Sequence, residues 1–344
     1  MASRRWIWPI DRPCRLVRAQ RHPISRSRKM DKANRYLQAG TRENTRKSYR
    51  AAIEHFEVTW GSYLPTTGEG IVRYLAEYAD KLSLNTLKQR LAALAQWHIT
   101  QGFPDPTKSP NVRQMIKGIR VVHPTRVKQA APLLIRHLEQ AIEWLEREAA
   151  AALERGDYKS LVRHRRSVAM VLIGFWRGFR GDELARLTVE NTEASSGEVI
   201  SFYLPYTKGD RAHEGQTFQT PALTKLCPVE AYINWITVAG LTKGPVFQRI
   251  DRWGNLSGKA IQPHSLIPLL RRIFKEAGLP EALYTSHSMR RGFATWASSN
   301  GWDIKALMGY VGWKDMKSAL RYVDSSMSFG GLAVRSASKR LTDD

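Results

Sequence analysis

A histidine and an arginine three residues apart mark one place in this chain where phosphate chemistry is possible. They are His287 and Arg290, within the segment 286–290, which has the character of a helix start. Residues three apart share one face of a helix, and the N-terminus of a helix favours a phosphate group. The pair is therefore a candidate for binding a phosphate ester and exchanging a proton with it.

Five further side chains suited to the same chemistry stand in order along the chain: Arg180, Glu183, Lys208, Trp313 and Tyr322. Arg180 and Glu183 are one helical turn apart, and Lys208 falls in the turn of an expected β-hairpin. Trp313 lies 23 residues after the arginine of the first pair, and Tyr322 lies nine residues later on an expected helix. A tyrosine hydroxyl, a lysine and two arginines are groups that can attack, protonate and neutralise a phosphodiester.

Other ways of handling phosphate have no sequence signal here. A phosphate-binding loop of the Walker type is absent, because Ser257-Gly258-Lys259 lacks the required spacing. No cluster of histidines, cysteines or acids has the spacing of a zinc site, and the acids are not grouped to hold two magnesium ions. We therefore expect no metal and no cofactor, with arginine and lysine neutralising the phosphate charge.

The order of these residues resembles that of the tyrosine recombinases, also called phage-type integrases. The family pattern is R-x-x-E-L, a lysine in a hairpin turn, H-x-x-R, G-H or G-W, and a terminal tyrosine, and it is matched over about residues 41–325. Most members carry histidine where this chain has tryptophan, and the Cre-type members carry tryptophan. The resemblance implies the following catalytic residues: Arg180, Lys208, His287, Arg290, Trp313 and the nucleophile Tyr322.

Elementary chemistry gives these residues roles. In-line attack on a phosphodiester gathers negative charge on the non-bridging oxygens, which the guanidinium forks of Arg180 and Arg290 can neutralise bidentately. Tyr322 has an ordinary pKa of about 10, so its attack on phosphorus needs a base or a strong cationic field. His287 is the candidate for accepting its proton. The resemblance to the family implies that the phosphotyrosyl bond is formed with the 3′-phosphate of the cleaved strand.

The remaining residues assist this step. Lys208 is the candidate for protonating the departing 5′-oxygen. Glu183 is the candidate for holding Arg180, one helical turn before it, in place. Trp313 can donate its indole N–H to the phosphate or pack against the tyrosine helix, and both roles stay open. Neighbours of the same residue types leave alternatives: Arg177 and Arg186 for Arg180, Arg211 and Lys225 for Lys208, and Tyr310 for Tyr322.

The charge of the chain favours a polyanionic partner. Its 54 Lys and Arg against 31 Asp and Glu give a net charge of +23. Residues 1–30, 31–120 and 121–344 contribute +8, +6 and +9, so every part of the chain is cationic. The longest apolar stretch, 168–176, is broken by Arg177, so no membrane span is expected. Two cysteines, Cys14 and Cys227, exclude a disulfide framework.

The elements that must position the site fall into two expected domains. Four amphipathic helices over about 41–120 predict a helical domain at 31–120, followed by a linker at 121–131. The resemblance implies that this helical domain is the core-binding, DNA-binding domain of the family. The catalytic domain at 132–325 is predicted to hold helices at 133–155, 161–178, 265–277, 288–300 and 316–323, and a strand pair at 199–204 and 216–220. Residues 1–30 are expected to form a basic arm without a fold. The fold class is thus mainly α with a small β-sheet, arranged as a two-domain DNA clamp.

The resemblance also implies an activity. It predicts site-specific cleavage and exchange of double-stranded DNA within a homotetramer, through a Holliday junction, in the cytoplasm at the nucleoid and without a membrane partner. The tail at 326–344 can reach a neighbouring protomer, as in relatives. Two alternatives stay open: a type IB topoisomerase that relaxes DNA, and a catalytically silent DNA-binding protein of the same fold.

Overall fold

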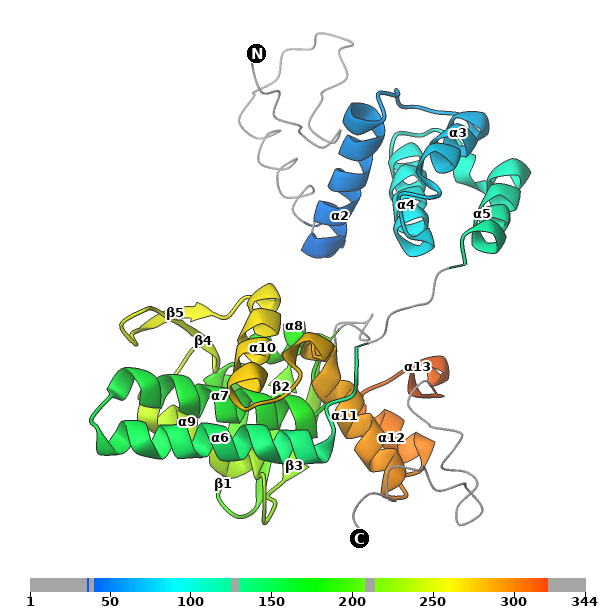
Figure 1. Cartoon of the computed structure of the whole chain (residues 1–344). Coiled ribbons are helices and arrows are strands. Elements are labelled where there is room, and N and C mark those ends of the chain that lie inside the picture. The colour runs from blue at the N-terminus through cyan, green and yellow to red at the C-terminus, as the bar shows by residue number, and fades with distance from the viewer. Residues whose placement is uncertain (1–35, 37–39, 125–129, 208–213, 321–344) are drawn as a thin grey trace, which may run out of the picture. The chain divides into compact units, whose positions relative to one another are not determined.

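The protein forms two compact units that divide between Lys128 and Gln129. A computed structural model describes residue 36 and residues 40–124, 130–207 and 214–320 (Figure 1). Lys208 and Tyr322, two of the predicted site residues, lie outside the described residues, as do the predicted arm and tail.

The first unit is helical. Its helices are α2 (Glu43–Glu54), α3 (Gly68–Tyr78), α4 (Leu84–Thr100) and α5 (Pro110–Val122), with a π-helical turn at His55–Thr59 after α2. Hydroxyl caps set two of the starts: Oγ of Ser83 accepts from the Thr86 N–H at 3.1 Å, and Oγ of Ser109 accepts from the Val112 N–H at 3.4 Å. Helix α5 ends at Val122, two residues inside the segment expected as a linker.

The second unit is mainly helical with small antiparallel sheets, as the sequence predicts. Its helices are α6 (Ile135–Glu154), α7 (Tyr158–Trp176), α8 (Gly181–Ala185), α9 (Pro228–Ala239), α10 (Leu266–Glu276), α11 (Ser286–Ser299), α12 (Ile304–Val311) and α13 (Met316–Leu320). Its strands are β1 (Thr192–Ser195), β2 (Val199–Leu204) and β3 (Gln216–Pro221) in one sheet, and β4 (Gln248–Ile250) and β5 (Leu256–Ala260) in another.

Helix α7 is the centre of this unit. Every residue from Arg166 to Trp176 is buried, and the helix packs against α6, α9 and α11 (Figure 1). The second half of the helix, 168–176, is apolar all round, which is typical of such a central position. Within the described ranges, no helix is both long and apolar enough to cross a membrane.

The three-stranded sheet anchors the chain just before Arg180. Strand β2 is central, and it turns Ile200, Phe202 and Leu204 into the core. Phe179 packs edge-on against Phe202 and Phe218, with ring centroids 5.5 and 5.4 Å apart. The residue next to the first predicted catalytic arginine is therefore fixed to both strands of the hairpin.

A close approach of two segments generates a stability prediction. A Cβ atom at Gly292 in α11 would lie 2.1 Å from the carbonyl oxygen of Leu133 and 2.8 Å from the ring of Phe175. Gly292→Ala should therefore lower the free energy of unfolding of this unit by about 2–3 kcal/mol, the upper range for overpacking. Denaturant unfolding measures it.

Gly309, in the neighbouring helix α12, is the matched control. A Cβ atom there would meet nothing within 4 Å. Gly309→Ala should leave stability unchanged or raise it by up to about 1 kcal/mol, the helix-propensity difference. Equal effects of the two substitutions would contradict the packing described here.

Candidate active site

Arg180 stands at the turn between α7 and α8. It is the N-cap residue of α8, and Glu183 occupies the third position of that helix. The Glu183 carboxylate accepts from the Arg180 backbone N–H at 2.9 Å and from its Nη1 at 2.7 Å. The R-x-x-E spacing thus fixes both the start of α8 and the direction of the guanidinium.

Arg290 reaches the same carboxylate from α11. Its Nη1 lies 3.9 Å from Oε2 of Glu183 and donates to the Gly178 carbonyl at 2.6 Å. The Arg290 side chain is only 4% exposed, and that of Arg180 is 26% exposed. Two guanidinium groups therefore share one carboxylate, which leaves an excess of positive charge with Arg180 on the solvent side.

The arginines also hold Glu183 in its ionised form. Burial by itself raises the pKa of this carboxyl, but Arg180 and then Arg290 outweigh it, so the pKa lies below the ordinary value of 4.5. Glu183 is consequently a fixed negative charge at neutral pH and orients the two guanidinium groups.

Two glycines bring these segments together. Gly178 ends α7 with φ +60° and presents its carbonyl to Arg290. A Cβ atom at Gly181 would lie 3.1 Å from Leu266 and 3.3 Å from Ser286, the first residue of α11. The start of α8 therefore lies directly against the start of α11.

The first turn of α11 is fixed by a reciprocal cap. The His287 N–H donates to Oγ1 of Thr285 at 3.1 Å, and the Thr285 N–H donates to Oγ of Ser288 at 2.9 Å. The His287 side chain is exposed, one turn before the buried Arg290. Sequence reasoning predicted the shared face of these two residues.

Trp313 lies beside Arg290. It follows Gly312, which ends α12 in the left-handed conformation, and the Trp313 N–H donates to the Met308 carbonyl at 2.9 Å. The tryptophan is 7% exposed, and its ring centroid lies 5.1 Å from the guanidinium carbon of Arg290. The indole ring thus covers one side of the arginine–glutamate cluster.

Lys208 and Tyr322 are not described, but the residues that lead to them are. Nη1 of Arg186, just after α8, donates to the Tyr206 carbonyl at 2.9 Å, and its guanidinium lies 4.2 Å from the Tyr206 ring centroid. The hairpin stem is thereby attached to the segment that carries Arg180. On the other side, α13 is described as far as Leu320, two residues before Tyr322 in the sequence.

Two of the alternative residues make contacts of their own. Arg186 pairs with Asp182 at 2.9 Å, and the Tyr310 hydroxyl lies 3.0 Å from Oγ1 of Thr220. Lys225 is exposed after β3, and Arg211 lies outside the described residues.

Sequence reasoning missed the carbonyl of Gly178 and the close approach at Gly181. The two glycines that flank Phe179-Arg180 were the signal for both.

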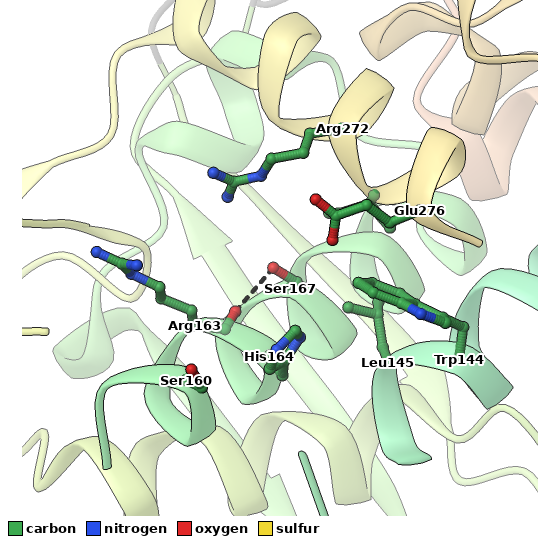
Figure 2. Close-up of a pocket in the computed structure, with 9 residues that line it drawn as sticks. Trp144, Leu145, Ser160, Arg163, His164, Ser167, Arg272 and Glu276 are labelled. Atoms are coloured by element: carbon green, nitrogen blue, oxygen red, sulfur yellow. Dashed lines mark hydrogen bonds between the residues drawn. The ribbon is translucent and has the colours of Figure 1, made fainter. Parts of the chain in front are cut away.

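A separate hollow opens between α6, α7 and α10 and is shown in Figure 2. Its volume is about 190 Å³, and none of the predicted site residues lines it. Arg163 and Arg272 lie on one side, with Glu276 and His164 nearby, and the Arg163 guanidinium donates to the Asp251 carbonyl at 2.6 Å. Its charges are mixed, and Arg163 is used to hold the residue that follows β4. In the described part of the chain, no group of three or more His, Cys, Asp or Glu side chains could hold a metal ion.

Comparison with known proteins places the chain in a family. Residues 143–328, more than half of the sequence, match the phage integrase family. The chain belongs to this family, the tyrosine recombinases. It is accordingly a site-specific DNA recombinase of the integrase type.

Individual relatives agree with this assignment. A protein described as an integrase/recombinase XerD homolog from Selenomonas ruminantium is 29% identical over 308 residues, covering 87% of this chain and 86% of the relative. The Cre recombinase of Escherichia phage P1 is 25% identical over 294 residues, covering 79% and 80%.

Solved structures share the fold. The XerH recombinase in a post-cleavage complex with its difH substrate matches with a TM-score of 0.59 at 19% identity, covering 82% of this chain and 77% of XerH. A lambda integrase dimer bound to a core site matches with a TM-score of 0.54 at 15% identity, covering 86% and 94%.

The shared carboxylate generates a prediction about pH. Glu183→Gln removes the buried charge between the buried guanidinium of Arg290 and the partly exposed one of Arg180, so the free energy of unfolding should fall by about 3 kcal/mol at neutral pH. Because the folded-state pKa of Glu183 lies below 4.5, this difference should be full above about pH 4.5 and shrink as the pH falls through the folded-state pKa. Denaturant unfolding of both proteins across pH 3–7 measures it.

Glu190→Gln is the control for this experiment. Glu190 is exposed and accepts from the Gly244 N–H at 2.8 Å, away from the arginines. Its substitution should change stability little. A loss in Glu183→Gln that is the same at pH 3 and pH 7 would show that the carboxylate charge is not what holds the cluster.

Proposed function

We propose that this recombinase cleaves and rejoins DNA through a 3′-phosphotyrosyl bond to Tyr322, without a metal ion, and exchanges strands through a Holliday junction. The observation that supports this most is the cluster of Arg180, Glu183 and Arg290 beside Trp313. It offers buried positive charge that one carboxylate does not neutralise, which is what a phosphodiester needs as charge develops on it.

The two arginines have different parts in this proposal. Arg180 is the more exposed and meets the scissile phosphate from the solvent side, while Arg290 supplies a fixed field from within. Their guanidinium planes are oriented by Glu183 before DNA arrives, so little reorganisation is required when the phosphorus is attacked.

Proton transfer is assigned to His287 and Lys208. His287 accepts the proton of the Tyr322 hydroxyl, since it lies exposed on the face that leads to Arg290. Lys208 protonates the departing 5′-oxygen. The attachment of Tyr206 to Arg186 supports this, because it ties the hairpin stem to the segment of Arg180. Trp313 donates its indole N–H to the phosphate or supports the cluster by packing.

Both units take part in DNA binding under this proposal. The helical domain at 31–120 and the catalytic domain at 132–325 contact the duplex, the basic arm at 1–30 adds charge, and the tail at 326–344 contacts a neighbour in a homotetramer at the nucleoid. The net charge of +23 supports this arrangement. So do the structural relatives, XerH and lambda integrase, which were captured on their DNA sites.

Substitution of the nucleophile tests the central step. Tyr322→Phe should bind DNA as the native protein does and form no denaturant-resistant covalent adduct, because only the phenolic oxygen is lost. Tyr310→Phe is the control and should still form the adduct, since that hydroxyl is directed at Thr220. An adduct that persists in Tyr322→Phe would assign the nucleophile to another residue.

A second assay separates recombination from DNA relaxation. With two recombination sites in one reaction, the native protein should give recombinant products and trapped four-way junctions. Covalent adducts accompanied only by relaxed plasmid would instead identify topoisomerase chemistry of the same residues.

The role of Lys208 is testable with a modified leaving group. Lys208→Ala should cleave ordinary DNA more slowly by a factor of about 10²–10⁴, the range for lost acid catalysis. A substrate with a bridging 5′-sulfur has a leaving group that needs no proton, so it should restore most of the rate. If the sulfur substrate rescues Arg211→Ala and does not rescue Lys208→Ala, the expected register of the hairpin is wrong and Lys208 is not the proton donor.

A further inference from the structure

Arg177 is a buried cation that the proposed mechanism does not use. It lies at the end of α7, one turn before Arg180, and is only 3% exposed. Burial lowers the pKa of its guanidinium, which nevertheless stays protonated at neutral pH. A charge in this position costs free energy unless its surroundings compensate, so its contacts require an explanation.

The guanidinium lies between a strand of the hairpin and helix α12. Its carbon is 3.9 Å from the ring centroid of Tyr310 in α12 and 4.8 Å from that of Phe218 in β3. Its Nη2 donates to the Tyr310 carbonyl, and its Nε and Nη1 have no hydrogen-bond partner among the described residues. The Tyr310 hydroxyl reaches Oγ1 of Thr220 in β3 at 3.0 Å, which joins the same two elements.

The C-terminal end of α12 is capped by two arginines. The N–H groups of Gly312 and Trp313 donate to the carbonyls of Gly309 and Met308, as in a Schellman motif. The next two carbonyls accept from guanidinium groups: that of Tyr310 from Arg177, and that of Val311 from Nη2 of Arg290 at 3.4 Å. Cations are favoured at this end of a helix dipole.

This capping determines where the residues after α12 begin. Gly312 packs on β3, because a Cβ atom there would lie 3.2 Å from the Phe218 ring. Trp313 follows at once, and α13 leads on toward Tyr322. Strand β3 in turn follows the hairpin turn of Lys208. Arg177 thus contacts α12, which precedes the proposed nucleophile Tyr322 in the chain, and β3, which follows the proposed acid Lys208.

We propose that Arg177 is a positioning residue for DNA cleavage, whose guanidinium fixes the last turn of α12 against β3 and so aligns Trp313 and Tyr322 with the lysine hairpin. The inference rests on the proposed function for the roles of those three residues. It concerns placement, since Arg177 itself is covered by Tyr310 and Phe218 and does not touch the phosphate.

The chain offers a matched control. Arg166 lies on the same helix, is 6% exposed, and donates from Nη1 to the Gln248 carbonyl at 2.8 Å, on the side of β4. Its Nε also lacks a hydrogen-bond partner among the described residues. Arg166→Met and Arg177→Met therefore remove equivalent buried charges, and only Arg177→Met acts on α12.

The kinetic test is single-turnover cleavage at saturating enzyme. Arg177→Met should lower the rate of covalent-adduct formation per folded molecule by about 10–100-fold, the scale for a displacement of about 1 Å at the reacting groups. Its Kd for DNA should stay within about threefold of native, because the contact of Arg180 with the phosphate and the positive charge of Arg290 remain. Arg177→Lys keeps the charge, so its cleavage rate should lie between those of the native protein and Arg177→Met. Arg166→Met should cleave at the native rate per folded molecule.

A second measurement does not depend on catalysis. Backbone hydrogen exchange in the free protein should become faster at residues 308–313 in Arg177→Met, and stay native there in Arg166→Met. If Arg177→Met does not fold, Arg177→Lys takes its place in both measurements.

Two results would overturn the inference: a native cleavage rate per folded molecule, or native exchange at residues 308–313. The exchange result does not depend on the proposed function. The proposed function fails on a different result, a covalent adduct that still forms in Tyr322→Phe.

Discussion

The carboxylate of Glu183 between Arg180 and Arg290 is the interaction on which the rest of the site depends. Two guanidinium groups brought this close repel one another, and burial removes the water that would screen them. One carboxylate makes their approach possible without cancelling their charge. The cluster therefore keeps an excess of positive charge in the free protein, as the proposed binding of a phosphate requires.

The surrounding elements of the fold position the side chains of this cluster. Phe179 fixes the arginine turn to the sheet, Gly178 turns a carbonyl toward Arg290, and Gly181 lets the start of α8 lie against α11. On the far side, Trp313 covers Arg290. The same arginine also caps α12, so the helix that precedes the proposed nucleophile is attached to the group proposed to bind its target.

Local pattern was enough to predict several of these features. The hydrogen bonds between Arg180 and Glu183 join residues three apart, and the apolar run at 168–176 and the β-formers at 199–204 gave α7 and β2. Helix α12 went unpredicted because a glycine, Gly309, lies inside its eight residues, and α9 because its apolar residues lie in a near-continuous run.

The contacts that complete the site lie beyond the reach of sequence spacing. Arg290 meets a carbonyl 112 residues away, and Arg177 meets one 133 residues away. The segment R-G-F-R contains two arginines, Arg177 and Arg180, and the sequence pattern alone does not show how each is enclosed. The three-residue spacing indicates that Glu183 holds Arg180, but only the fold shows that Arg177 is enclosed by aromatic rings. The fold class was thus accessible from the sequence, whereas the long-range contacts by which the predicted site residues support one another were not.

The central claim is that Arg180 and Arg290 act on the negative charge of the scissile phosphate. The most direct measurement compares cleavage of ordinary DNA with cleavage of a duplex that carries an uncharged methylphosphonate at the scissile position, for native protein, Arg180→Ala and Arg290→Ala. The account predicts a loss of about 10²–10³ in each variant on ordinary DNA, the scale for one lost donor to a developing charge, and at least a tenfold smaller loss on the neutral substrate. Equal losses on the two substrates would contradict it.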